Sequence, residues 1–133
     1  MSSPVTIVGN LTRDPELKFI NSGSATVRFS VAVTKKGWQD KPDIVSFFNC
    51  NAIGDIATNI SNTLHKGNRV VVYGALRHRT WDKPDGTKGE TTEIEVEAVG
   101  PDLRFNTAVV ENHIAKTQSK VQQAYSQQEE EAF

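Results

Sequence analysis

The sequence predicts a small all-β protein, because strand periodicity dominates it and only one internal segment has convincing helical periodicity. Most segments alternate apolar and polar residues, which is the pattern of strands that bury one face. A strong turn signal, Asp82-Lys83-Pro84-Asp85-Gly86, separates two of these segments. The 133 residues are enough for one domain and a short tail.

Three predicted strands come first. A short strand around Val5 and Ile7 stops at the Gly-Asn pair that follows. The second strand covers residues 25–36, where alternate apolar side chains share one face: Val27, Phe29, Val31 and Val33. The third covers residues 44–53, a run rich in β-branched and aromatic residues. Its core face is expected to hold Phe48, Cys50 and Ala52.

One helix is predicted at residues 55–66. Asp55 is suited to cap its start, and Gly67 is suited to close its end. Apolar residues recur every four positions and form a single stripe, made of Ile56, Ile60 and Leu64.

Two strands are expected after the helix. Residues 69–81 predict a strand that bends or bulges at Gly74, as at the corner of a barrel. In residues 91–99, Ile94 and Val96 alternate with Glu93, Glu95 and Glu97. Three strands, a helix and further strands follow the order of an OB-fold barrel. We therefore predict an all-β, five-stranded Greek-key OB-fold barrel with one helix between strands 3 and 4, and an extra C-terminal strand at Leu103–Val110.

The chain is expected to divide into a domain at residues 1–110 and a short, mostly disordered Gln/Glu-rich tail at residues 111–133. The domain holds 13 Lys and Arg against 12 Asp and Glu, a net charge of +1, whereas the tail holds 2 against 4. Attraction for phosphate must therefore come from the arrangement of charges. A single cysteine, with neither a secretion signal nor a membrane span, favours the cytoplasm.

The side of each strand opposite the core carries the functional signal. The first such face carries Arg28, Lys36 and Trp38, and the next carries Phe47, Asn49, Asn51 and Ile53. If Leu76 faces the core, then Arg77, Arg79 and Trp81 share a third outward face. An aromatic side chain beside Arg, Lys or Asn therefore occurs on three strands of one predicted barrel.

This combination suits single-stranded DNA. An exposed aromatic ring stacks on an unpaired base, contributing about 1–3 kcal/mol with little sequence preference. Arg and Lys neutralise phosphates, and Asn adds hydrogen bonds without demanding one base. Each aromatic taken alone is also compatible with a half-buried position or a subunit contact. Their joint occurrence favours DNA binding.

The same segments resemble the bacterial single-stranded DNA-binding protein family over about residues 4–105. The resemblance rests on ordered blocks: Val8-Gly9-Asn10-Leu11, Asp14-Pro15-Glu16, Trp38-Gln39-Asp40-Lys41, Gly67-Asn68-Arg69-Val70, Tyr73-Gly74-Ala75-Leu76-Arg77-His78-Arg79-Thr80-Trp81, Asp85-Gly86 and Thr91-Thr92-Glu93. The segment Glu93–Phe105, with Gly100-Pro101, most resembles the actinobacterial branch.

The resemblance implies a non-catalytic protein that protects single-stranded DNA in replication, recombination and repair, usually as a homotetramer. Trp38 and Trp81 match two stacking tryptophans of the family. Phe47 stands where a third Trp is frequent, and Ile53 replaces a frequent stacking Phe. The branch resemblance also implies that residues 103–110 extend the sheet and help to clamp subunits together.

The tail resembles the partner-docking tip of that family in part. Its candidate partner-binding residues are Glu129, Glu130, Glu131 and Phe133, which keep the acids and the terminal Phe without a preceding Pro. In the family such tips dock replication and repair proteins. A merely solubilising acidic tail is the alternative.

Enzymatic activity is not expected, and neither is a cofactor or a metal. The three histidines are scattered, Cys50 lies on a predicted core face, and no phosphate-binding glycine loop is present. Two alternatives stay open. One is an OB-fold protein-interaction subunit or accessory paralogue with its aromatics in subunit contacts, and the other is an OB fold that binds RNA or an oligosaccharide.

Overall fold

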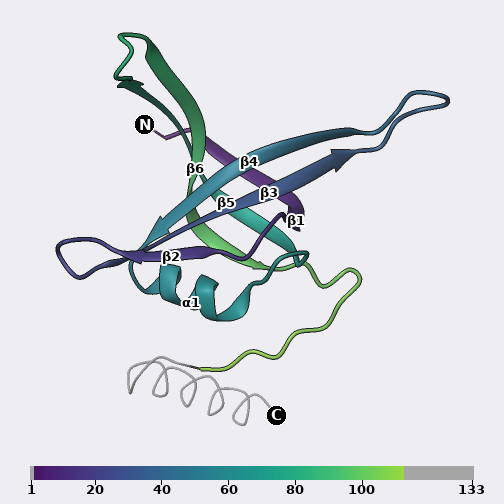
Figure 1. Ribbon diagram of the computed structural model, residues 1–133. Helices are drawn as coiled ribbons and strands as arrows, with labels where there is room; N and C mark the ends of the chain where they lie inside the picture. The colour runs from purple at the N-terminus through teal and green to yellow at the C-terminus, as the bar shows by residue number, and fades with distance from the viewer. Residues whose placement is uncertain (1, 113–133) are drawn as a thin grey trace.

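A computed structural model describes residues 2–112 of the chain (Figure 1). Within these residues the order of elements is β1 (Pro4–Leu11), β2 (Glu16–Phe19), β3 (Ala25–Lys35), β4 (Ile44–Ile53), α1 (Asp55–Thr63), β5 (Arg69–Asp82) and β6 (Lys88–Pro101). The five predicted barrel strands and the helix are present. The four-residue strand β2, which pairs with β3 at its outer edge, was not predicted. No helix in residues 2–112 has the length and apolarity needed to cross a membrane.

The sheet closes into a barrel. Its strand order is β1-β5-β6-β4-β3-β2, and an additional pairing between β1 and β3 joins the two sides. That closing contact pairs Asn10 with Ala32 and Leu11 with Val31. β4 and β6 run parallel, whereas the other pairs are antiparallel. A closed five-stranded barrel with its helix between β4 and β5 confirms the predicted OB fold.

The core follows from the period-two pattern. Val27, Phe29 and Val31 on β3 are at most 2 % exposed, and Cys50 and Ala52 face them from β4. Val33 and Phe48 are only partly buried, near the point where the pairing of β3 with β1 ends at Ala32. Burial of such side chains contributes about 25 cal/mol per Å² of apolar surface removed from water.

Helix α1 covers one end of the barrel (Figure 1) and adds Ala57 and Ile60 to the core, and Leu64 joins them just after the helix. It is shorter than predicted, because the chain becomes extended at Leu64. The expected cap is also wrong: Gly54, with φ 98°, precedes the helix and Asp55 lies in its first turn. Gly67 does not close the helix either, because the C-cap is Leu64; it lies in the turn that follows, with φ 87°, and its N–H donates to the Leu11 carbonyl at 2.8 Å.

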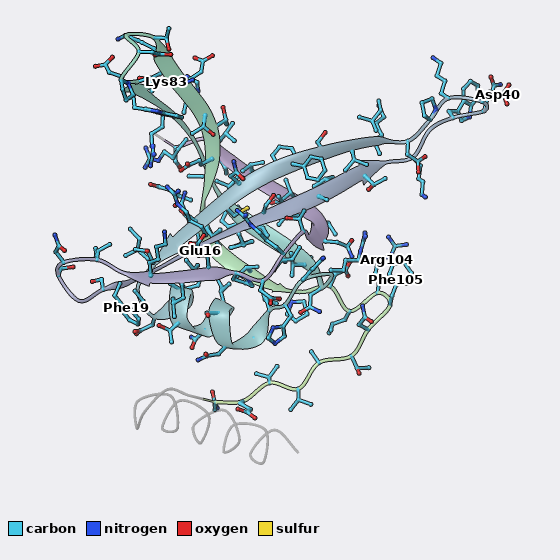
Figure 2. All side chains as sticks on the ribbon, viewed as in Figure 1. Glu16, Phe19, Asp40, Lys83, Arg104 and Phe105 are labelled. Atoms are coloured by element: carbon cyan, nitrogen blue, oxygen red, sulfur yellow. The ribbon has the colours of Figure 1, made fainter. Side chains whose placement is uncertain are left out.

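Two hairpins extend beyond the barrel as arms. The β3–β4 arm and the β5–β6 arm leave it in different directions (Figure 1). Figure 2 marks their tips, with Asp40 on the first arm and Lys83 on the second. A bulge between Tyr73 and Gly74 lies where β5 bends toward its arm, as predicted for Gly74. A Cβ at Gly74 would meet the Glu95 carbonyl oxygen at 2.0 Å, so only glycine fits there.

The extra strand predicted at residues 103–110 is wrong for this chain. β6 ends at Pro101, and the following residues form a turn and then an irregular segment. The turn is held by the Asp102 carboxylate. It accepts a hydrogen bond from the Arg69 side chain at 2.7 Å and another from the backbone N–H of Arg104 at 3.1 Å. Both guanidinium groups also lie over the Phe105 ring. No strand of residues 2–112 pairs with the segment, and apolar side chains on it are exposed.

Candidate nucleic-acid interface

The register aligns side chains into rows across the side of the sheet that faces away from the core. One row runs Ser30–Asn49–Glu93–Arg77 through β3, β4, β6 and β5. The neighbouring row runs Arg28–Asn51–Glu95 through β3, β4 and β6. We call this side of β3, β4, β5 and β6 the outer face. Farther along the two arms, the same face carries Phe47 on β4 and Trp81 on β5.

An open cleft of about 440 Å³ lies on the outer face between the base of the β5–β6 arm and the end of the β3–β4 pair that is farthest from its arm tip. It is lined by Thr26, Val27, Arg28, Asn51, Ala52, Ile53, Arg77, His78, Arg79, Glu93 and Glu95. Four of the predicted site residues therefore meet there: Arg28, Ile53, Arg77 and Arg79. A smaller hollow of about 180 Å³ shares Arg28 and Asn51 with this cleft and adds Asn49 and Arg13.

Apart from Asn49 in the hollow, the predicted DNA-binding residues outside the cleft lie on the arms. Phe47 is 68 % exposed and Trp81 is 43 % exposed, and both lie on the outer face. Lys36 and Trp38 lie beyond the end of β3, in the connection that forms the tip of the first arm. The structure thus places basic residues at the centre of the face and aromatic residues around it.

Trp81 is held by its cross-strand partner, Gly89. A Cβ built on Gly89 would lie 2.5 Å from an indole carbon of Trp81, so the ring occupies the space that any other residue would fill. Gly89 is buried by this contact although it lies on an exposed arm. The ring is therefore fixed in orientation while part of its surface stays open to solvent.

Trp38 lies in a connection held by Asp43. The Asp43 carboxylate accepts the Gly37 N–H at 2.8 Å and the Lys36 ammonium at 3.4 Å. These bonds lower the pKa of Asp43 below its usual value, and the bond from the Gly37 N–H has the larger effect. The Trp38 carbonyl accepts the Lys41 N–H, yet the Trp38 side chain is 75 % exposed. Lys36 is thus already paired with a carboxylate.

Carboxylates also lie inside the cleft. Arg77 donates from Nε to Glu95 at 2.9 Å, and Asn51 donates to Glu93 at 2.9 Å. Among residues 2–112, Arg13, Arg28 and Arg79 form no ion pair. The cleft and the hollow beside it therefore hold four guanidinium groups against two carboxylates, a net charge of +2 with His78 neutral.

Sequence reasoning missed several lining residues and misplaced one. Glu93 and Glu95 were detectable, because their alternation with Ile94 puts them on the outer face. Arg13 follows β1 in a loop, where strand periodicity gives no signal. Leu76 was expected in the core but is 42 % exposed, because the pairing of β5 with β1 ends at Ala75, one residue earlier.

Other chemistry has little support in the described residues. Burial raises the pKa of the Cys50 thiol to about 12, so at neutral pH it is not a thiolate nucleophile. No group of three His, Cys, Asp or Glu within residues 2–112 is arranged to hold a metal ion. The predicted tail residues Glu129, Glu130, Glu131 and Phe133 lie outside the described residues.

A closed OB barrel with basic residues in an open cleft and exposed aromatics around it defines a nucleic-acid-binding class of protein. Residues 3–102 match the single-strand binding protein family, and the chain belongs to that family.

Relatives agree with this assignment. The chain is 42 % identical over 113 residues to a single-stranded DNA-binding protein of Mycobacterium leprae, covering 80 % of this chain and 66 % of that protein. It is 38 % identical over 111 residues to one from Bifidobacterium longum, covering 80 % of this chain and 51 % of that protein. The match thus spans between about half and two thirds of these relatives. They confirm the expected resemblance to the actinobacterial branch.

A solved structure is also similar. The small single-stranded DNA-binding protein from Streptomyces coelicolor matches with a TM-score of 0.65 and 31 % identity. The match covers 77 % of this chain and 96 % of that one.

Proposed function

We propose that this chain binds single-stranded DNA without catalysis and largely without sequence preference, laying the strand along the outer face. The supporting observation is the cleft at the base of the β5–β6 arm, which gathers Arg28, Arg77 and Arg79 from two strands beside the exposed Ile53. The DNA strand crosses this cleft and continues over the outer face to the aromatic residues of the two arms. Duplex DNA does not suit this face, because its bases are already stacked on each other.

Stacking on the arms supplies the larger share of the binding energy. Trp38, Phe47 and Trp81 all expose ring surface, and each stacked base contributes about 1–3 kcal/mol. Ile53 is 65 % exposed at the edge of the cleft and offers apolar contact without a ring. Asn49, in the adjoining hollow, supplies hydrogen bonds that do not require one base.

Phosphate contacts are few and local. Arg13, Arg28 and Arg79 form no ion pair within residues 2–112 and can bind a phosphate directly. Arg77 and Lys36 must first break an ion pair with a carboxylate. Three neutralised phosphates give a slope of about −2 for log affinity against log salt, since each contributes about −0.7 on single strands. This slope is shallow, in keeping with a face on which stacking dominates.

The biological setting is proposed from the family. Binding would protect single strands during replication, recombination and repair, in the cytoplasm at the nucleoid. A homotetramer is expected, and the apolar side chains of Val71 and Tyr73, which lie on the part of β5 that pairs with β1 and do not line the cleft, leave an apolar area for subunit contacts. A domain at residues 1–110 would bind the DNA, and a tail at residues 111–133 would recruit replication and repair proteins.

A fluorescence titration tests the DNA-binding proposal. Oligo-dT should quench the fluorescence of the two tryptophans. The matching RNA should quench it more weakly, and duplex DNA hardly at all. Replacing both tryptophans with alanine removes the signal, so the affinity of that variant is measured by the anisotropy of labelled DNA. An unchanged affinity in that variant contradicts the stacking mechanism.

Phe47→Ala and Phe19→Ala make a matched pair. Phe19 is 69 % exposed, almost the same as Phe47, but its pairing with Ala25 puts it on the side of the sheet opposite the outer face. Figure 2 shows Phe19 near the β2–β3 turn, away from both arm tips. Only Phe47→Ala should weaken oligo-dT binding, by about fivefold or more. Equal losses in both variants indicate aromatics that act in subunit contacts, which is the alternative function.

A further inference from the structure

The carboxylates of Glu93 and Glu95 lie in the path that the proposed strand follows. They come from adjacent outward positions of β6, and each is directly beside an asparagine of β4. Each carboxylate has already accepted one hydrogen bond, from Asn51 and from Arg77 respectively. The oxygens of both groups keep free lone pairs, and the open cleft exposes them to a ligand.

This acidic strip decides which part of a nucleotide can face it. A phosphate would be repelled by two carboxylates at short range. The unpaired guanidinium groups of Arg28 and Arg79 lie to either side, on β3 and β5, and attract the backbone there. The DNA strand can therefore bind both groups only in one orientation. Its phosphates lie along the arginines, and the edges of its bases point at Glu93 and Glu95.

A carboxylate is an acceptor only, so it distinguishes bases by their donors. Cytosine, adenine and guanine each carry an exocyclic amino group, and carboxylates accept from that of cytosine in known recognition. Thymine and uracil have no amino group. Their one N–H lies between two carbonyl oxygens, which repel a carboxylate.

We infer that Glu93 and Glu95 make the cleft favour amino-bearing bases over thymine and uracil at the nucleotide that crosses it. The inference rests on the proposed function and adds one position of base preference to binding that is otherwise independent of sequence.

Oligo-dC and oligo-dU of equal length give the sharpest test, because the two bases differ only at the edge that would meet the carboxylates. Affinities are measured at pH 8 by anisotropy for the wild type, Glu95→Gln and Glu93→Gln. Each glutamine should lower the ratio of dC affinity to dU affinity by about fivefold, since a neutral acceptor makes a weaker hydrogen bond than a charged one. Differences in the flexibility of the two oligomers cancel, because each oligomer is compared with itself across variants.

Glu90→Gln is the matched control. Glu90 lies on the same strand, 3.4 Å from Nε2 of His78, at a position that faces away from the side of Trp81 and Arg77. Glu90→Gln should leave the ratio of dC affinity to dU affinity unchanged. An unchanged ratio in Glu95→Gln and Glu93→Gln, with dC and dU affinities rising together, overturns the inference and leaves simple charge repulsion. Failure of the wild type to bind any oligomer overturns the proposed function instead.

Discussion

The two arms hold their tryptophans in different ways. On the β5–β6 arm, Trp81 lies within a strand and its indole is packed on Gly89, so less than half of the side chain is exposed. On the β3–β4 arm, Trp38 lies in the connection between strands and three quarters of its side chain is exposed. The hydrogen bonds around Trp38 fix the backbone of the connection and do not touch the ring.

This difference bears on how much binding energy each ring delivers. A ring that is already oriented loses little conformational freedom when a base stacks on it, whereas a free side chain loses about 0.5–1.5 kcal/mol on being ordered. Trp38 offers the larger surface and Trp81 the smaller ordering cost. We therefore expect the β5–β6 arm to be the stronger stacking platform per unit of exposed ring.

The largest predicted effect tests this ranking directly. Trp81→Ala should lower the affinity for oligo-dT by about 30-fold, and Trp38→Ala by about fivefold. Stacking contributes about 1–3 kcal/mol per base, and Trp38 keeps less of this energy because its ring must be ordered on binding. Affinities are measured by anisotropy of labelled DNA at fixed salt. A larger loss for Trp38→Ala than for Trp81→Ala would show that exposed area outweighs preorganisation.

The second effect isolates preorganisation without removing an aromatic ring. Gly89→Ala places a Cβ where the indole of Trp81 lies, so the ring must shift off the strand. We expect an affinity loss of about fivefold, between wild type and Trp81→Ala. Gly100→Ala is the control, because a Cβ there meets no atom within 4 Å and the backbone is not left-handed. Equal affinities for Gly89→Ala and the wild type contradict a functional role for the packed orientation.

The buried side of a barrel strand could be predicted from the sequence. The alternation of Val27, Phe29 and Val31 predicted which side of β3 is buried, and hence that Arg28 lies on the other side. That logic holds wherever one strand has a fixed inside and outside. It fails at Leu76, since the arm has left the barrel and its inner side is exposed as well.

Contacts between distant segments were beyond the sequence for a different reason. The pairing of β4 with β6 brings Asn49 beside Glu93, although 44 positions separate them and no local pattern encodes that register. The packing of Trp81 on Gly89 depends in the same way on hairpin register. The segment 103–110 has strand-like composition, but within residues 2–112 it has no partner strand, and a strand needs a partner to form.

A smaller effect concerns the cation beside Trp38. Asp43→Asn removes the negative charge that pairs with Lys36, which frees its ammonium for a phosphate. The affinity for oligo-dT should rise by about twofold at low salt, and the salt slope should steepen by about 0.7, as expected for one more neutralised phosphate. Asp40→Asn, which removes an equal charge at the tip of the same arm, is the control. If both variants change the slope equally, general charge is responsible and the ion pair is not.

The smallest effect is a pH response of the connection around Trp38. The lowered pKa of Asp43 means that its bonds to Gly37 and Lys36 are fully present above the usual value of 3.8. They are lost as pH falls through the lower value of the folded state. Because the chain has two tryptophans, Trp81→Phe leaves Trp38 as the sole emitter and Trp38→Phe leaves Trp81.

Emission from Trp38 should therefore stay constant from pH 8 to about pH 4 and change only at lower pH, as the connection around it loosens. Emission from Trp81 should change less in this range, because its indole is held by packing on Gly89, although the Asp82–Lys88 pair at 3.8 Å and the Asp85 bonds to Thr87 also hold this arm tip. Far-UV circular dichroism follows global acid unfolding independently. Adding Asp43→Asn to Trp81→Phe should abolish the early step. A step that persists in that double variant assigns the response to another group and removes Asp43 as the feature that distinguishes the two arms.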